Sequence, residues 1–414
     1  MQTDTTKVPF TGYQKFVMFI LAITQFTVIL DFMVMSPLGD LLMKSMDLSP
    51  KQFGLAVSAY AFSAGASGLL TAGFADRFDR KKLLTFFYGG FILGTIFCGM
   101  AHTYPLLVAA RIITGLFGGV ISSISMAIIT DLFDIHHRGR VMGVISMGFG
   151  ASQVLGIPIS LYFANHWGWQ LPFLLVAGLA LLVLVLIQVK LQPVTQHLLN
   201  QQKTSVFSHL IKTFVNKEYR IGFTCTALLS IGGFMMMPFG SAFAVNNLGM
   251  TQEQLPLLFM VSGITALILL PFVGKLSDRI DKFRVFAVAA VWMVFIALIY
   301  TNLGQTPLWM VILLNVLLMI GILSRTVPCN ALTSAVPHMA DRGAFMSINS
   351  SLQQIAGGIA ATIAGFIVVQ KNKQSPLEHY NTVGYLMTVM TLISIWMVYR
   401  VSELVKSRLR AAKA

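Results

Sequence analysis

Three ionisable side chains, Asp31, Arg111 and Arg325, lie within long apolar runs of this 414-residue sequence. An ionisable group inside a membrane costs several kcal/mol unless it is paired or hydrated, so each is a candidate functional residue. At 1.5 Å of helical rise per residue, Asp31 lies about 22 Å from one boundary of its run and Arg111 about 9 Å from the opposite boundary of its own. In a hydrocarbon core of about 30 Å, these depths agree within one helical turn. The spacing therefore predicts an ion pair between Asp31 and Arg111.

Burial and the nearby guanidinium act on the proton affinity of the carboxylate in opposite directions. Such a pair can therefore exchange a proton if water reaches it alternately from two sides. We therefore expect Asp31 and Arg111 to couple proton movement to a change of conformation. A permanent structural salt bridge is the alternative interpretation.

Arg325 has no acidic residue in any apolar run to pair with, apart from Asp31. It lies about 12 Å from the inner boundary of its run, whereas Asp31 lies deeper. An anionic group of a ligand or a lipid headgroup could neutralise Arg325. Snorkelling of the side chain toward the interface is equally compatible with the sequence.

Several polar and polarizable side chains in the same runs would suit contact with an amphipathic organic molecule. Asn349 and Gln353 are four residues apart and share one helix face, which favours this pair. Each residue taken alone also fits ordinary helix packing. The candidate ligand-contacting residues, with Arg325, are Gln25, Gln153, Phe234, Met237, Asn349 and Gln353.

The elements that hold these residues must be membrane-spanning helices. Hydrophobic residues make up 56% of the chain and the mean hydropathy is +0.76, which is more apolar surface than a water-soluble core needs. Runs of about 20 residues can cross a bilayer as helices. The sequence therefore predicts an all-α integral membrane protein with twelve spans, at 16–38, 51–75, 83–101, 105–131, 141–163, 171–189, 219–245, 254–274, 285–303, 308–333, 343–369 and 381–403.

The basic residues that give the net charge of +14 are distributed according to membrane topology, and this argues against nucleic-acid binding. Most of the 29 Lys and Arg residues fall in segments on the side that carries both termini. The positive-inside rule therefore predicts that both termini are cytoplasmic, and we expect the protein in the cell (inner) membrane. The loops on the other side hold only Lys44, Lys51, Lys371 and Lys373.

No sequence feature predicts a metal site, a cofactor or an enzyme. The three cysteines, Cys98, Cys225 and Cys329, fall within spans and lack CxxC spacing, so neither disulfides nor zinc are expected. There is no GxxxxGK[ST] loop for nucleotide binding. The histidines in loops have no convergent partners, so a membrane enzyme or receptor is disfavoured.

One polar interval divides the chain. Residues 190–218 are expected to be a cytoplasmic linker, with a short surface helix in its second part, between an N-terminal bundle at 1–189 and a C-terminal bundle at 219–414. The block "GFADRFDRKK" at 73–82 returns as "GKLSDRIDKFR" at 274–284, and "HRGR" at 137–140 is echoed by "DRGA" at 341–344. These repeats indicate an internal duplication.

The block at 73–82 resembles the G-x-L-x-D-R-x-G-R-K signature loop of the major facilitator superfamily, although Asp79 stands where Gly is usual. The block at 274–284 resembles the weaker second copy, with Asp281 at the same place. The stretch from Ala110 to Gly143 is similar to the fourth span of that superfamily, with Arg111 and Gly115 at matching positions. The resemblance covers the whole chain and is nearest to the twelve-span drug:proton antiporters.

This resemblance implies a monomer with two pseudo-symmetric six-helix halves around a central cavity. It also implies proton-coupled export of small amphipathic organic molecules, drugs or metabolites, by alternating access. An importer or facilitator of an organic solute, including an anionic one, is the alternative on the same fold. Span 5 departs from the antiporter pattern, because Ile157 separates Gly156 from Pro158 where a Gly-Pro pair is usual, and this leaves the transport direction open.

The resemblance further implies a latch on the cytoplasmic side that closes in one access state. Asp76 would face the positive N-terminal end of span 11 near Arg342, and Asp278 would face the start of span 5 near Arg138. Solvated charges that only set topology are the alternative. The gating residues implied are Asp76, Arg77, Arg138, Asp278, Arg279 and Arg342.

Overall fold

The computed structural model describes residues 10–71, 77–195, 198, 206–338 and 341–411, most of which are helical. The N-terminal half contains α1 (Gly12–Val34), α2 (Gly39–Met46), α3 (Pro50–Thr71), α4 (Arg80–Gly99), α5 (Tyr104–Leu132), α6 (Ile135–Ala151), α7 (Ile157–Trp167) and α8 (Gln170–Lys190). After α9 (Val206–Val215), the C-terminal half contains α10 (Lys217–Phe234), α11 (Gly240–Asn246), α12 (Leu255–Arg279), α13 (Lys282–Thr301), α14 (Leu308–Ser334), α15 (Arg342–Ile367) and α16 (Tyr380–Ala411).

The predicted all-α membrane fold with twelve spans is confirmed. Eleven helical runs among the described residues are long and apolar enough to cross a bilayer, with α6–α7 and α10–α11 each forming one run. The twelfth span, α15, has 26 residues but carries the polar stretch "SINSSLQQ" at 347–354. The short surface helix expected in the polar interval is α9.

Several span boundaries were predicted wrongly, among them the start of the fifth span, placed at 141 where α6 begins at Ile135, and the end of the eighth, placed at 274 where α12 ends at Arg279. The first and last spans also differ. The first span was placed at 16–38, but α1 ends at Val34, because Pro37 follows and disfavours helical backbone before it. The last span was placed at 381–403, but α16 continues to Ala411, because its final turns are a polar helix that extends beyond the apolar run. Neither change moves a candidate site residue out of its helix.

The second aspartate of each repeated charged block caps a helix. Asp79 accepts a hydrogen bond from the backbone N–H of Lys81 at 2.9 Å, at the start of α4. Asp281 accepts one from the N–H of Arg284 at 3.1 Å, at the start of α13. A side-chain acceptor at this position satisfies a donor that the helix itself cannot. This local role explains why aspartate replaces the glycine of the signature loop in both copies.

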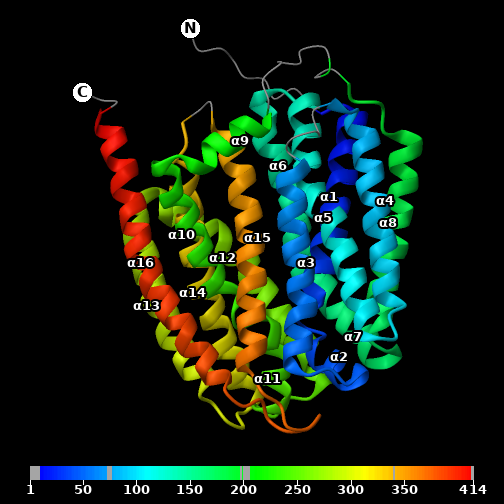
Figure 1. The fold of residues 1–414 in the computed structure, drawn as a ribbon, viewed down its shortest axis with the longest axis vertical. Coiled ribbons are helices and arrows are strands. Elements are labelled where there is room, and N and C mark those ends of the chain that lie inside the picture. Colours follow the sequence, from blue (N-terminus) through cyan, green and yellow to red (C-terminus); the bar gives the residue numbers. More distant parts are fainter. Residues whose placement is uncertain (1–9, 72–76, 196–197, 199–205, 339–340, 412–414) are drawn as a thin grey trace.

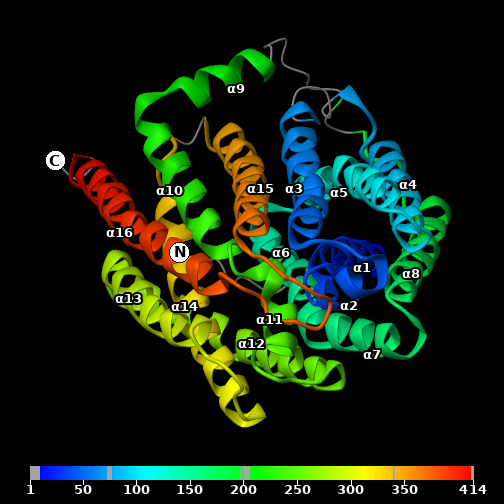
Figure 2. The ribbon, with the colours of Figure 1, turned by 60° about the horizontal axis from the view of Figure 1, so that its bottom comes forward.

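The helices form two groups that run lengthwise beside each other (Figure 1). We call the end where α1 begins, α8 ends and α9 lies the terminal end, and the end that holds α2 and α11 the far end. Between the halves, α3 packs against α15, and α12 packs against α7 (Figure 2). The four helices α3, α15, α7 and α12 therefore form the interface between the halves.

The buried apolar residues form three clusters, and their membership differs between the two ends. One cluster joins both halves toward the far end and includes Val34 and Phe53 with Phe239 and Leu255. A second contains only residues of the N-terminal half. The third contains buried residues of α9 and the C-terminal half. The halves thus share a core at the far end. Toward the terminal end each has its own cluster of buried residues, and Leu69 of α3 packs against the C-terminal one.

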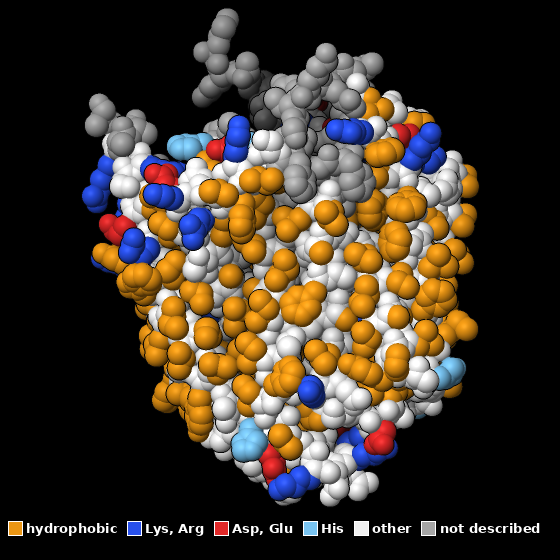
Figure 3. Space-filling model, in the orientation of Figure 1, with side chains coloured by type: hydrophobic (Ala, Val, Ile, Leu, Met, Phe, Trp, Pro, Cys, Tyr) orange, Lys and Arg blue, Asp and Glu red, His pale blue; other side chains and the backbone are white. Residues whose placement is uncertain are grey.

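The surface of the molecule has an apolar middle and charged ends. Large apolar side chains are exposed along the spans, among them Val288, Ile268 and Trp309. In Figure 3 these apolar side chains cover the middle of the visible face, while Lys, Arg, Asp and Glu gather toward the two ends. An apolar belt of this kind matches a surface solvated by lipid tails.

A π-helical turn, Ser152–Gly156, joins α6 to α7 within one span. A π turn holds one residue more than the matching α-helical turn. It therefore accommodates the residue that separates Gly156 from Pro158, the departure noted in the sequence. The backbone of this turn also approaches α12 closely, since a Cβ built on Gly263 would lie 2.9 Å from the backbone of Gln153.

Candidate functional site

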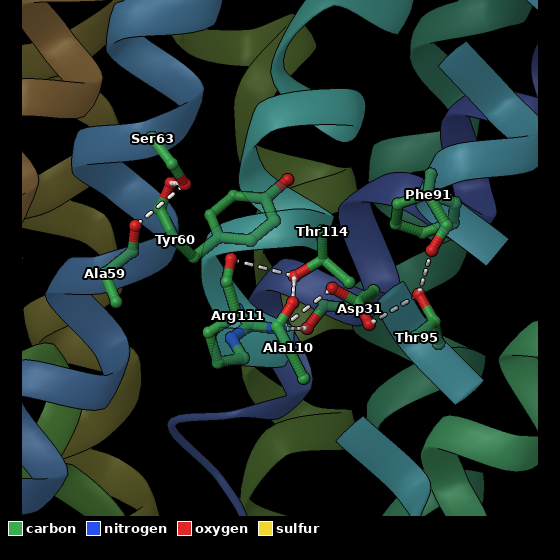
Figure 4. A network of polar contacts seen from close by, with 9 residues as sticks. All are labelled: Asp31, Ala59, Tyr60, Ser63, Phe91, Thr95, Ala110, Arg111 and Thr114. Carbon is green, nitrogen blue, oxygen red and sulfur yellow. Dashed lines mark hydrogen bonds and ion pairs between the residues drawn. The ribbon is translucent and has the colours of Figure 1, made fainter. Parts of the chain in front are cut away.

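Asp31 and Arg111 form a fully buried ion pair in the middle of the N-terminal half. Arg111 Nη1 donates to Asp31 Oδ2 at 2.9 Å, and neither side chain has exposed surface. Thr95 Oγ1, on α4, lies 3.2 Å from Asp31 Oδ1 (Figure 4). The predicted pair therefore exists, with α1, α4 and α5 each supplying one member of the hydrogen-bonded group.

The guanidinium of Arg111 is only partly satisfied by this pair. Its Nε and Nη2 atoms find no hydrogen-bond partner among the residues that the structure describes. The ring of Tyr60, on α3, covers it instead, with Arg111 Cζ 4.6 Å from the ring centroid. A cation over an aromatic face is stabilised by about 0.5–2 kcal/mol, depending on how far it is desolvated. This contact supplies part of the stabilisation that hydrogen-bond acceptors would give to the guanidinium.

Gly115 lets α3 approach α5 closely enough to bring Tyr60 to Arg111. A Cβ at this position would lie 2.0 Å from Ser63 Oγ and 2.4 Å from the backbone oxygen of Tyr60. No side chain larger than hydrogen fits between the two helices there. The glycine that matched the superfamily pattern thus has a packing role beside the ion pair.

A cavity lies between the halves, on the terminal side of Tyr60. Its volume is about 130 Å³, and no charged side chain lines it. Serine hydroxyl groups of α5 and α15 and the side-chain amide of Gln354 on α15 belong to its lining. The lining residues are Val28, Ile29, Phe32, Tyr60, Ala64, Gly68, Gly118, Gly119, Ser122, Ser123, Ser347, Ser350, Ser351 and Gln354.

The structure places only some of the predicted ligand-contacting residues near this cavity. Gln25 is buried and accepts from Ser122 Oγ at 3.0 Å, so it supports a lining residue. Gln153 lies in the π-helical turn against α12. Phe234 and Met237 line a second, smaller hollow toward the far end, which also includes Phe32.

On α15 the expected face is displaced by one residue. Gln353 is exposed, whereas the next residue, Gln354, lines the cavity. Asn349 is half-buried, and its amide oxygen lacks a hydrogen-bond partner within the described part of the chain. Five serines that line the cavity were not among the expected residues, although their hydroxyl groups within "ISSIS" at 121–125 and "SINSS" at 347–351 are the available signal: Ser122, Ser123, Ser347, Ser350 and Ser351.

Arg325 is buried inside the C-terminal half and does not line the cavity. Its side chain is 1% exposed, so it does not snorkel to the interface. Nη1 donates to Thr391 Oγ1 on α16 at 3.1 Å, and Nη2 lies against Gly233 of α10. No carboxylate of the described residues pairs with it. A ligand would have to enter between α10, α14 and α16 to reach this cation.

Of the contacts expected in the latch, the one between Asp278 and Arg138 is not formed in this conformation. Asp278 and Arg279 are exposed at the end of α12, and Arg342 is exposed in the first turn of α15. Arg138 donates to the carbonyl oxygens of Phe133 and Thr130, so it binds the end of α5 instead of Asp278. Arg77 is exposed. Asp76 lies outside the described residues.

Hydrogen bonds join the two halves at the far end. The buried carboxylate of Asp40, on α2, accepts from Lys44 Nζ at 2.7 Å and from the side-chain amides of Asn246 and Gln252 in the other half. Ser241 Oγ donates to the carbonyl oxygen of Ser36 at 2.8 Å. These contacts close the far end around one shared carboxylate.

A second set of bonds between the halves lies about two helical turns deeper, between α3 and α15. Ser58 Oγ donates to the carbonyl oxygen of Gly358 at 2.9 Å, and Thr362 Oγ1 lies 2.8 Å from Ser58 Oγ. Toward the terminal end, no hydrogen bond or ion pair connects the halves among residues 10–70, 77–134, 137–190, 217–338 and 341–408. The conformation is therefore tied at the far end.

Twelve spans in two halves around a polar cavity define a membrane transport protein. The sequence profile of the Major Facilitator Superfamily matches residues 21–324 and 222–414, and the chain belongs to this superfamily. It is a transporter and not an enzyme.

Known proteins match this chain along nearly its whole length at low sequence identity. Multidrug resistance protein 2 of Bacillus subtilis (strain 168) is 23% identical over 392 residues, which cover 92% of this chain and 96% of that protein. A bacterial homologue of the human lysosomal transporter Spinster has the same fold, with a TM-score of 0.77 at 15% identity and coverage of 95% and 98%. The D-xylose-proton symporter gives a TM-score of 0.75 at 18% identity and coverage of 94% and 98%.

Proposed function

We propose that this transporter is a proton-coupled antiporter that exports small amphipathic organic molecules by alternating access. The observation that carries the proposal is the buried pair of Asp31 and Arg111 next to a cavity between the halves. A charged carboxylate in hydrocarbon is unfavourable unless it is paired, so protonation of Asp31 is linked to its pairing with Arg111. Protonation of Asp31 frees Arg111 and loosens the packing of α1 against α5, which lets a proton drive a change of conformation.

The proposed motion is a rocking of residues 1–189 against residues 219–414, with 190–218 as the linker. The shared far-end core and the bonds to Asp40 support a conformation in which the far side is closed. The latch formed by Asp76, Arg77, Arg138, Asp278, Arg279 and Arg342 would then close the terminal end in the opposite state. Contacts that exist in only one state shift the balance between the two.

We place both termini in the cytoplasm and the protein, as a monomer, in the cell (inner) membrane. The excess of Lys and Arg on the terminal side supports this orientation. Cysteines introduced at Gln201 and Lys406 are expected to react only from the cytoplasm, and one at Lys373 only from outside. Reaction of the Gln201 variant from outside would reverse the orientation.

The cavity supports an amphipathic organic substrate, because its lining contains both hydroxyl and amide groups and apolar side chains. The name of the Bacillus subtilis relative, a multidrug resistance protein, favours export of drug-like molecules. Import or facilitated transport on the same fold is the competing function. The two are separated by whether solute movement opposes or follows the proton gradient.

The decisive experiment uses purified protein in liposomes. A screen for solute-induced proton flux first identifies a transported compound. The Asp31→Asn variant should then still exchange that compound between the two sides, because exchange requires no net change in protonation. It should lose accumulation driven by a pH gradient. Asp47→Asn, an exposed change at the far end, serves as the matched control. If Asp31→Asn accumulates the compound as well as the parent does, the pair is structural.

A further inference from the structure

Tyr60 separates the cavity from the ion pair. On one side its ring contacts the guanidinium of Arg111, with Cζ 4.6 Å from the ring centroid. On the other side the residue lines the cavity, and its hydroxyl lies 3.1 Å from where a Cβ on Gly118 would be. Only 2% of the residue is exposed, so the ring fills the space between the two.

The other groups that face the pair do not reach the cavity. Thr95 and Cys98 face it from α4, and Thr114 lies one turn beyond Arg111 on α5. None of these lines the cavity, whereas Tyr60 on α3 does. Asp31 and Arg111 have no exposed surface. Among the described contacts of the pair, the path through Tyr60 is therefore the direct one from the cavity.

The ring of Tyr60 is held by a row of aromatic side chains that crosses between the halves. Its centroid lies 5.2 Å from that of Phe32 on α1, and Phe32 lies 6.3 Å from Phe234 on α10, edge to face. Phe234 in turn packs against Gly357 of α15, where a Cβ would lie 3.4 Å from the ring. A movement of the C-terminal half therefore acts on the support of Tyr60.

The guanidinium beneath the ring has unused hydrogen-bonding capacity. Arg111 Nε and Nη2 lack acceptors within the described part of the protein. Water that entered past Tyr60 would supply them, because a buried donor without an acceptor is unfavourable. Displacement of the ring would thus hydrate Arg111 and bring water to Asp31 in a single step.

We propose that Tyr60 is a positioning residue that gates proton access to Asp31 from the cavity, and that the Phe32 and Phe234 contacts hold the gate closed. A ligand in the cavity, or separation of the halves, would release the ring. The inference rests on the proposed function, in which Asp31 is the acid that takes up the proton. It adds the element through which cavity occupancy or movement of the halves reaches that acid.

The test measures access to Asp31 directly and requires no known substrate. Dicyclohexylcarbodiimide reacts with protonated carboxyl groups in apolar surroundings, and mass spectrometry of the purified protein reports the modification of Asp31. Tyr60→Ala should raise the rate about tenfold or more, because a gate open in about 10% of molecules or fewer would become open in nearly all. Tyr60→Phe, which keeps the ring, should stay near the parent rate. Phe234→Ala should raise the rate in the same direction as Tyr60→Ala.

Controls keep the outcome interpretable. Asp31→Asn gives the background, and Tyr88→Ala removes another buried tyrosine of the same half, one that bonds to Thr27 and does not line the cavity. If Tyr60→Ala does not fold, Tyr60→Leu and Phe234→Ala take its place. Parent-like labelling of the ring-deleted variants, equal acceleration by Tyr60→Phe, or equal acceleration by Tyr88→Ala would each overturn the gate. Failure of the coupling role itself would appear separately, as accumulation retained by Asp31→Asn.

Discussion

Asn246, on α11 of the C-terminal half, donates its side-chain amide to the buried carboxylate of Asp40, on α2 of the N-terminal half. Asp40 is 1% exposed and also accepts from Gln252 of the same opposite half. A single negative charge thus receives donors from two bodies that must separate if the far end is to open. Hydrogen bonds to a buried charge contribute about 1.5–3 kcal/mol each.

Asp40→Asn should therefore open the far end. The new amide offers one acceptor oxygen where two served, so its NH₂ group must face either the NH₂ group of Asn246 or the donors of Gln252 and Lys44. A change of about 2 kcal/mol would shift the balance of states by more than tenfold. We expect a cysteine at Met237, which lines the smaller hollow, to react faster with an impermeant maleimide added on the far side. Asp47→Asn is the matched control, because its ion pair with Lys373 is exposed and contributes at most about 1 kcal/mol.

Asp76→Asn should shift the balance the other way. The change keeps the size of the side chain and removes the charge that is expected to favour the start of α15 when the terminal end closes, an effect of about 0.3–2 kcal/mol. A cysteine at Ser347, which lines the cavity, should then become more reactive from the terminal side. Asp134→Asn, an exposed aspartate at the same end, is the control. Unchanged reactivity of Ser347→Cys would leave the loop with a role in topology only.

Gly115→Ala should destabilise the protein by about 1–3 kcal/mol, the usual range for overpacking. The added methyl group would meet Ser63 and the backbone of Tyr60, and backbone cannot move aside cheaply. Thermal unfolding in detergent measures the change. Gly89→Ala on α4 is the matched control, because nothing lies within 4 Å of its added Cβ. The control should be neutral or more stable by up to about 1 kcal/mol. Equal behaviour of both variants would contradict tight packing of α3 on α5.

Asp341 gives a prediction about pH. The Tyr219 hydroxyl donates to this carboxylate at 2.7 Å and His209 Nε2 lies 2.8 Å away, and these hydrogen bonds hold the pKa of Asp341 below its usual range. A lowered pKa in the folded state stabilises the protein above the ordinary aspartate pKa of about 3.9, and that contribution is lost as the pH falls through the lowered value. Asp341→Asn should thus cost about 1 kcal/mol at neutral pH.

The cost of Asp341→Asn should shrink at the acid end of the accessible range, where the parent carboxyl is also protonated. Unfolding midpoints of parent and variant, measured across pH in the same detergent, give the comparison. Glu253→Gln, an exposed change in the short 3-10 helix Gln252–Gln254 at the far end, is the control. A difference that is constant with pH would mean that the hydrogen bonds do not depend on the charge of Asp341.

The span count and the pairing of Asp31 with Arg111 could be predicted because both depend on the number of residues along each apolar run. The helical rise converts a position in an apolar run into a depth, and two charges at one depth in hydrocarbon have strong reason to pair. The aspartate caps of α4 and α13 could also have been predicted, since an N-cap is a local feature of sequence. Asp79 and Asp281 were interpreted only as departures from the signature loop.

Which residues line the cavity depends on how each helix is rotated about its own axis, and hydropathy does not report that rotation. Gln353 and Gln354 are equally polar and adjacent, but a step of one residue turns a helix by about 100° and exchanges an exposed side chain for a lining one. In a membrane both faces of a span are apolar, so the pattern that orients a helix in water is weak. Asp40 was missed for another reason, because its partners Asn246 and Gln252 come from short helices just beyond the predicted spans.

The π-helical turn at Ser152–Gly156 gives one span two independent orientations. α6 packs against α1 of its own half, while the turn and α7 pack against α12 of the other half. The extra residue rotates the rest of the span by about 100° around the helix axis. The side chains that contact α1 therefore do not determine which side chains contact α12. Substitutions on either side of the turn can therefore accumulate separately, and deletion of the single residue Ile157 would rotate α7 away from α12.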